Sequence, residues 1–148
     1  MKKLTVALGL ATLVAGIAVA VPASAQFAKT KDAQKYREAA FTLMGNHMGR
    51  LTAMVKGQVP FDAAKAQESA RLIDSIGKLP WEAFVPDSVS SEMKGDPAKE
   101  SAKFKELSEK FTAESAKLVT ASATLDGLKG QLGKTGGTCK GCHDAFKK

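Results

Sequence analysis

Two cysteines and a histidine stand together near the C-terminus, in the order Cys139-Lys140-Gly141-Cys142-His143. Residues three and four positions apart share one face of a helix, so Cys139, Cys142 and His143 can all meet one planar group. The C-x-x-C-H pattern is the attachment signature of a c-type haem. The two thiols would add to the haem vinyl groups as thioethers, and the His143 imidazole would ligate the iron from the proximal side. The sequence therefore predicts one covalently bound haem c per chain.

Two other chemistries use cysteines at this spacing, and the sequence disfavours both. A redox disulfide of the thioredoxin type opens a helix after a strand, whereas no strand pattern precedes Cys139. A structural zinc site needs a fourth ligand. Only His47 remains to provide it, and that histidine lies within an apolar helical stripe. Haem attachment is therefore the favoured interpretation of the motif.

The first 25 residues have the three parts of a secretory signal peptide. Lys2 and Lys3 precede a largely apolar, uncharged run over residues 6–21, and Ala23-Ser24-Ala25 forms an A-x-A cleavage site. The run is short for a permanent anchor, which needs roughly 20 residues. We expect cleavage after Ala25, export to the periplasm, a mature domain over residues 26–148 and no stable membrane insertion afterwards.

Composition narrows the class of protein further. The chain has 148 residues, 22 basic and 15 acidic, for a formal charge of +7 that falls to +5 once the two signal-peptide lysines are removed. A hydrophobic content of 44% is too high for a disordered tail, and two cysteines are too few for a disulfide-stapled mini-protein. A mildly basic exported chain gives no reason to expect a nucleic-acid partner.

The elements that must position the motif follow from the spacing of apolar residues. Four segments are predicted as helices: residues 30–56, 62–78, 96–122 and 124–147. Asp62 and Asp96 are candidate N-caps, with Pro97 at the first helical position. Residues 79–95 lose the helical period and are predicted to be a long connection without structure of its own. The expected fold is all-α, an antiparallel up-down-up-down four-helix bundle.

With these elements in place, the chain resembles the cytochrome c′ family over essentially all of residues 26–148. Four motifs carry the resemblance: QFAK at 26–29, KYREAAFTLM at 35–44, LPWEAF at 79–84 and CKGCHDAFKK at 139–148. The family is itself a known example of the four-helix bundle. The resemblance implies a five-coordinate, high-spin haem with His143 as its only protein ligand, which binds the gases NO and CO at iron.

Further site residues follow from the resemblance, position by position. An apolar side chain of the first helix closes the distal face in this family, and Phe41 occupies that position. Arg37 and Glu38 match haem-contact positions, with the arginine near a propionate; a solvated surface arginine is the alternative. Lys147 replaces the family's usual proximal arginine, which keeps the charge but loses the planar fork. The aromatic residues of LPWEAF are expected near the haem edge or as a cap on the core.

Two functions compete. The first is a gas-binding protein that sequesters or carries NO, with electron transfer as a further role and an unidentified redox partner. The second is a six-coordinate electron-transfer cytochrome of the c-556 type with Met44 as distal ligand, which would block small ligands. Phe41 at the distal position favours the first. A haem-free bundle would require the Cys139–His143 motif to be accidental. No acid–base pair is evident, so an enzyme is not expected.

The resemblance also implies a homodimer that pairs through the first two helices, with the same patch on both chains. The candidate contact residues are Ala39, Leu43, Ala53, Met54, Ala63, Ala70 and Ile73.

Overall fold

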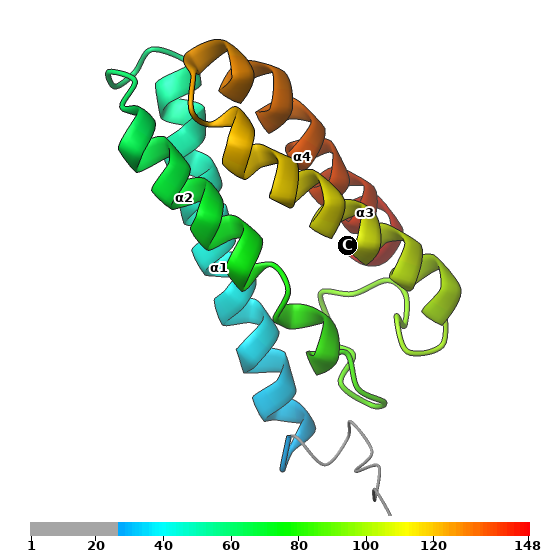
Figure 1. Ribbon diagram of the computed structural model, residues 1–148. Coiled ribbons are helices and arrows are strands. Elements are labelled where there is room, and N and C mark those ends of the chain that lie inside the picture. Colours follow the sequence, from blue (N-terminus) through cyan, green and yellow to red (C-terminus); the bar gives the residue numbers. More distant parts are fainter. Residues whose placement is uncertain (1–26) are drawn as a thin grey trace, which may run out of the picture.

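A computed structural model describes residues 27–148, and the expected signal peptide lies outside the described residues. Four helices run alternately up and down beside one another (Figure 1). Their bounds are α1 Thr30–Val55, α2 Ala63–Ile76, α3 Ser101–Ala121 and α4 Leu125–Phe146. This arrangement confirms the predicted all-α four-helix bundle. Within the described residues, no helix combines the length and apolar character needed to cross a bilayer.

The helix ends are fixed by local hydrogen bonds. The Asp62 side chain accepts from the backbone N–H of Lys65 at 3.1 Å and starts α2, as predicted. The Thr124 hydroxyl accepts from the backbone N–H of Gly127 at 3.1 Å and starts α4. Gly57 follows α1 with φ of 69°, a left-handed conformation that glycine adopts without strain. The predicted bounds of α1, α2 and α4 therefore hold to within two residues.

The predicted start of the third helix is wrong. Asp96 does not cap α3, which begins at Ser101. Its carboxylate instead accepts from the backbone N–H of Ala98 at 3.0 Å, and its carbonyl accepts from the backbone N–H of Glu100 at 2.9 Å. These are the bonds that an N-cap makes, but the turn ends at Glu100, whose φ of −96° and ψ of 41° lie outside the helical range. The result is a separate turn that contains Pro97 and precedes α3.

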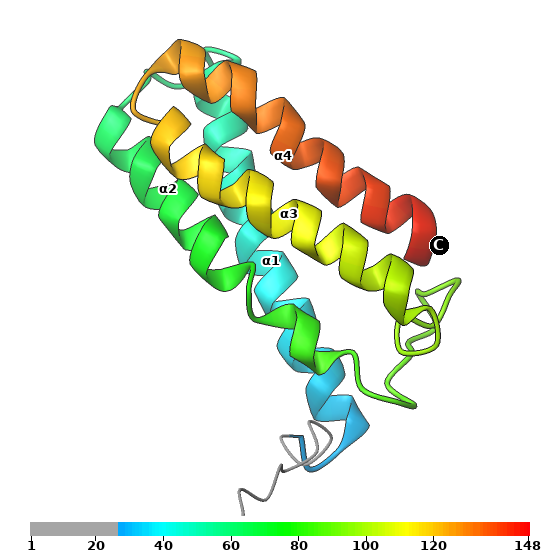
Figure 2. The ribbon, with the colours of Figure 1, turned by 45° about the vertical axis from the view of Figure 1, so that its right-hand side comes forward.

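The long connection also has structure of its own, against expectation. A 3₁₀ helix, η2 (Pro80–Ala83), forms at its start. At its other end the chain pairs with the C-terminus: Met93 and Lys147 form an antiparallel bridge, and the Lys148 N–H donates to the Glu92 carbonyl at 2.9 Å. The two segments lie together in Figure 2. The connection is therefore fastened to the end of α4.

The core receives one fully buried aliphatic residue from each helix: Leu51, Ile73, Leu118 and Leu128, all with no exposed surface. Met44 belongs to the same buried cluster. The helices α1 and α4 are close where α1 ends and α4 begins, and they diverge toward the other end (Figures 1 and 2). The diverging end holds the attachment motif.

The helix α4 is unusually rich in glycine. Six glycines fall between its first and last residues, and at Gly130, Gly133 and Gly137 an added methyl group would meet nothing within 4 Å. Each interior glycine disfavours a helix by roughly 1 kcal/mol relative to alanine. Packing against α1 and α3 must therefore hold α4 in its helical form.

Candidate functional site

The last third of α4 presents the predicted attachment residues. Both cysteines are free thiols and half-buried, and the His143 imidazole is exposed. The Cys139 thiol donates weakly to the Thr135 carbonyl at 3.7 Å, one turn earlier. Because helical geometry places Cys139, Cys142 and His143 on one face, all three can reach a single planar group laid against it.

Burial shifts the pKa of all three groups of the motif. Burial raises the pKa of the Cys139 thiol. Burial also raises the pKa of the Cys142 thiol, and the charge of Cys139 adds to that effect. Burial, followed by the nearby charge of Lys147, lowers the pKa of His143. This shift favours the neutral imidazole, which is the form that ligates a metal.

An aromatic wall joins α1 to α4 at this end of the bundle. Its rings are those of Phe41, Trp81, Phe84, Phe104 and Phe146. Ring centroids are 6.0 Å apart for Phe41 and Trp81, 5.8 Å for Trp81 and Phe104, and 5.9 Å for Phe104 and Phe146. Phe41, the predicted distal residue, therefore lies on the same apolar surface as Trp81 and Phe84. Phe146, at the end of α4, belongs to that surface too.

Arg37 is buried, with only 4% of its surface exposed, so the alternative of a solvated surface arginine is wrong. Its Nη1 donates to the Ala83 carbonyl at 2.9 Å and to the Ser88 hydroxyl at 3.1 Å, and its Nη2 donates to the Ser88 carbonyl. The guanidinium lies 4.7 Å from the centre of the Phe84 ring. Arg37 thus organises the connection after η2, and its contact with a haem propionate stays a prediction.

The two remaining predicted residues lie on the surface. Glu38 is exposed on α1, and its backbone carbonyl accepts from the Thr42 hydroxyl at 2.8 Å. Lys147 is exposed and its backbone is extended, although its N–H still donates to the His143 carbonyl at 2.9 Å. Its charge lies close enough to lower the pKa of His143. The structure therefore places Lys147 just beyond α4, beside the proposed ligand.

One feature of the site escaped the sequence analysis. The indole Nε1–H of Trp81 is buried and has no hydrogen-bond partner among residues 27–148. The sequence indicated where the ring belongs, but the absence of an acceptor depends on the packing around it. An unpaired N–H donor among apolar rings can be recognised only in the folded structure.

The residues present fit a haem. Two free thiols and an imidazole share a helix face, an apolar wall stands beside them, and a buried cation and a buried N–H adjoin that wall. Haem is a largely apolar plane that carries iron and two carboxylates, and it needs each of these features. A zinc site is not assembled: no group of three or more His, Cys, Asp or Glu side chains that could hold a metal occurs within residues 27–148.

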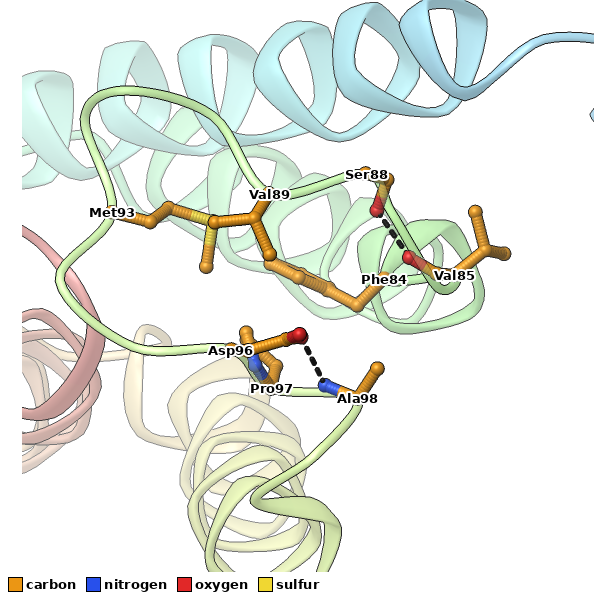
Figure 3. A pocket seen from close by; sticks show the side chains of 8 residues that line it. All are labelled: Phe84, Val85, Ser88, Val89, Met93, Asp96, Pro97 and Ala98. Atoms are coloured by element: carbon orange, nitrogen blue, oxygen red, sulfur yellow. Dashed lines mark hydrogen bonds between the residues drawn. The ribbon is translucent and has the colours of Figure 1, made fainter.

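Two surface depressions of the described residues lie in the loop before α3 and along α1. In the loop before α3, the side chains of Phe84, Val89 and Met93 fill the space between them, and the Ser88 hydroxyl donates to the Val85 carbonyl at 2.6 Å (Figure 3). That depression therefore belongs to the packing of the loop. An open groove of about 660 Å³ runs along α1 from Phe41 past Gly45 and Gly49. The groove leaves open space on one side of the Phe41 ring.

A four-helix bundle that carries C-x-x-C-H in its last helix defines a c-type cytochrome of the bundle class. The sequence profile of the family described as Cytochrome C′ matches residues 32–147. Cytochrome c′ of Rubrivivax gelatinosus is 44% identical over 128 residues, which cover 83% of this chain and 99% of that protein. Cytochrome c′ of Alcaligenes xylosoxydans xylosoxydans is 40% identical over 125 residues, which cover 83% and 98%. The chain belongs to the cytochrome c′ family.

Solved structures agree with this assignment. The crystal structure of the Rubrivivax gelatinosus protein matches with a TM-score of 0.78 and 43% identity, over 83% of this chain and all of that one. A carbon-monoxide-bound variant of the Alcaligenes xylosoxidans protein matches with a TM-score of 0.77 and 40% identity, over 82% and 98% of the two chains. Another variant of that protein carries bound NO. Members of this family bind haem c covalently, which confirms the predicted cofactor.

Proposed function

We propose that this protein is a periplasmic haem protein that binds NO and CO at a five-coordinate, high-spin iron and thereby sequesters or carries NO. The observation that carries the proposal is Phe41, whose apolar ring packs in the aromatic wall against Trp81 and Phe84. A phenyl ring offers no lone pair to iron and no hydrogen bond to bound O₂. The CO-bound and NO-bound relatives support the same ligands for this chain.

Different residues of the chain would hold the haem, ligate its iron and cover its open side. Cys139 and Cys142 would hold the haem as thioethers, and His143 would ligate its iron. When bound, the haem supplies an iron atom with one free coordination position. Phe41 keeps water and bulky ligands away from that position. No residue is assigned a catalytic role, and electron transfer is a secondary role that the same haem can perform.

The alternative distal ligand, Met44, is engaged elsewhere. Its side chain is 6% exposed and belongs to the buried core cluster with Leu51 and Ile73. If ligation of iron drew the thioether out of this packing, the site left empty would typically cost about 2–5 kcal/mol. Core packing of Met44 therefore favours the five-coordinate proposal.

An absorption spectrum distinguishes the two states. We expect the ferrous protein to show a broad, high-spin Soret band that shifts when CO or NO is added. A Met44→Leu variant, which keeps the apolar volume, should have the same spectrum. A sharp low-spin spectrum that ignores CO, and that becomes high-spin in Met44→Leu, would establish methionine ligation and overturn the proposal.

We also propose a homodimer, with a smaller contact patch than the sequence suggested. Met54, Ala70 and Ile73 were expected at the contact, but they are at most 8% exposed and form part of the core. Their helical stripes face the interior of the bundle. Leu43 on α1 and Leu72 on α2 are 51% and 37% exposed and can supply the apolar contact instead.

Sedimentation equilibrium at micromolar concentration tests the dimer. We expect dimer mass for the unmodified protein and monomer mass for Leu43→Lys, because a buried lysine without a partner disfavours an interface. Val89→Lys changes an exposed side chain outside α1 and α2 and should leave the dimer intact. A single species at monomer mass for the unmodified protein would reject the proposal.

A further inference from the structure

Trp81 has a buried hydrogen-bond donor without an acceptor. Its ring is packed edge-on against Phe41, Phe104 and Phe111, with centroids 5.8–6.0 Å away. The Nε1–H is buried within this cluster and has no partner in the described part of the chain. Leaving such a group unpaired costs about 1–3 kcal/mol. Because rings pack around the indole on several sides, it cannot easily turn the N–H toward solvent.

A buried positive charge adjoins the same segment. The Ala83 carbonyl, two residues after Trp81, accepts a hydrogen bond from Arg37. No carboxylate within residues 27–148 lies within ion-pair distance of that guanidinium. The acid of η2, Glu82, accepts instead from the exposed Tyr36 hydroxyl at 3.1 Å. The segment from Trp81 to Ala83 therefore adjoins both an unpaired N–H donor and a buried guanidinium that forms no ion pair with residues 27–148.

We propose that Trp81 is a positioning residue for the haem, and that its Nε1–H donates to one propionate carboxylate. Arg37 balances the charge of the same carboxylate. This inference deepens the proposed function, because it rests on the haem site described above. A neutral ligand such as CO could accept a hydrogen bond but could not compensate Arg37, which favours the carboxylate as the acceptor.

The proposed bond has two consequences for the haem. It fixes one edge of the plane relative to Phe41, because Trp81 contacts that ring directly. It also favours the ionised propionate, since a hydrogen bond to the charged form lowers the pKa of an acid. The chain has one tryptophan, so its indole proton gives a single signal in nuclear magnetic resonance.

The first test observes that signal in the ¹⁵N-labelled, CO-bound ferrous protein, which is diamagnetic. We expect a downfield, slowly exchanging indole proton whose chemical shift titrates in one step as the propionate is protonated. The titratable and charged residues beside this segment are Tyr36, Arg37 and Glu38 of α1 and Glu82 of η2. On α3, Lys103, Lys105 and Lys110 are the chain neighbours of the rings that pack against Trp81. The step should persist in Glu82→Gln. An indole shift that does not change with pH would overturn the proposal.

The second test compares Trp81→Phe with Phe84→Leu, which alters the same wall without removing an N–H. We expect Trp81→Phe alone to move the propionate bending band in the resonance Raman spectrum. It should also raise the propionate pKa by about one unit, a tenfold change in acid dissociation. Unmoved propionate bands together with a shifted Fe–CO stretch would show that the N–H faces the gas ligand and would overturn the proposal. Failure of the proposed function would appear separately, as a low-spin spectrum of the unmodified protein.

Discussion

Replacing Phe41 with alanine should speed CO association with the ferrous protein by roughly 100-fold. The Phe41 ring packs against Trp81 and Phe84 and covers the proposed distal position. The ring is partly buried, so moving it away from its contacts is assigned the low end of the cost of removing a core phenyl group, about 3 kcal/mol. This cost adds to the activation barrier for a ligand that binds on the distal side. Each 1.36 kcal/mol of barrier is about a factor of ten in rate. Flash photolysis or stopped-flow mixing with CO measures the change.

A matched truncation separates this effect from a general loosening of the fold. Phe61 is also a partly buried aromatic packed against the core, but it lies in the connection between α1 and α2, at the opposite end of the bundle from the motif. Phe61→Ala should lower the free energy of unfolding and leave the CO association rate unchanged. An unchanged rate in Phe41→Ala would show that Phe41 does not gate the iron.

Replacing Cys139 and Cys142 together with alanine should make the haem extractable by acid–acetone, whereas the unmodified protein should release none. Both thiols are free and lie on the same face of α4 as His143, so they are the groups available for thioether bonds. Without them, only the His143 bond and apolar packing hold the haem. Acid protonates the imidazole and solvent weakens the packing, so extraction should be essentially complete.

The single variants provide an internal control, because each keeps one thiol and should retain its haem through one thioether. Lys140→Ala lies between the cysteines, alters an exposed side chain that pairs with Asp144, and should release no haem. Covalent haem in the double variant would mean that the attachment sites have been assigned wrongly.

The four helices were predicted well from local patterns, because the apolar residues of each helix recur at helical spacing and form its buried face. The C-x-x-C-H motif is likewise local, and its geometry is set by the helix alone. The start of α3 was missed because the turn that Asp96 begins is interrupted at Glu100, whose backbone leaves the helical range. Local sequence patterns do not distinguish two backbone conformations whose free energies differ by about 1 kcal/mol.

The environment of Arg37 and Trp81 could not be predicted, for a different reason. The burial of Arg37 depends on Ala83 and Ser88, which lie 46 and 51 residues further along the chain. The unpaired N–H of Trp81 depends on rings contributed by α1 and α3. The same long-range packing placed Ala70 and Ile73 in the core instead of at a dimer contact. The burial of these residues depends on tertiary contacts, which local sequence patterns do not contain.

The glycines of α4 bear on how the protein matures. A glycine-rich segment is a poor nucleus for helix formation, because each backbone unit loses more freedom on ordering. The helix therefore has little tendency to form ahead of the rest of the bundle, so Cys139 and Cys142 are expected to be accessible in the newly made chain. Haem attachment is then expected to assist folding, because the thioethers and the His143 bond would add to the packing against α1 and α3 that holds α4 in its helical form.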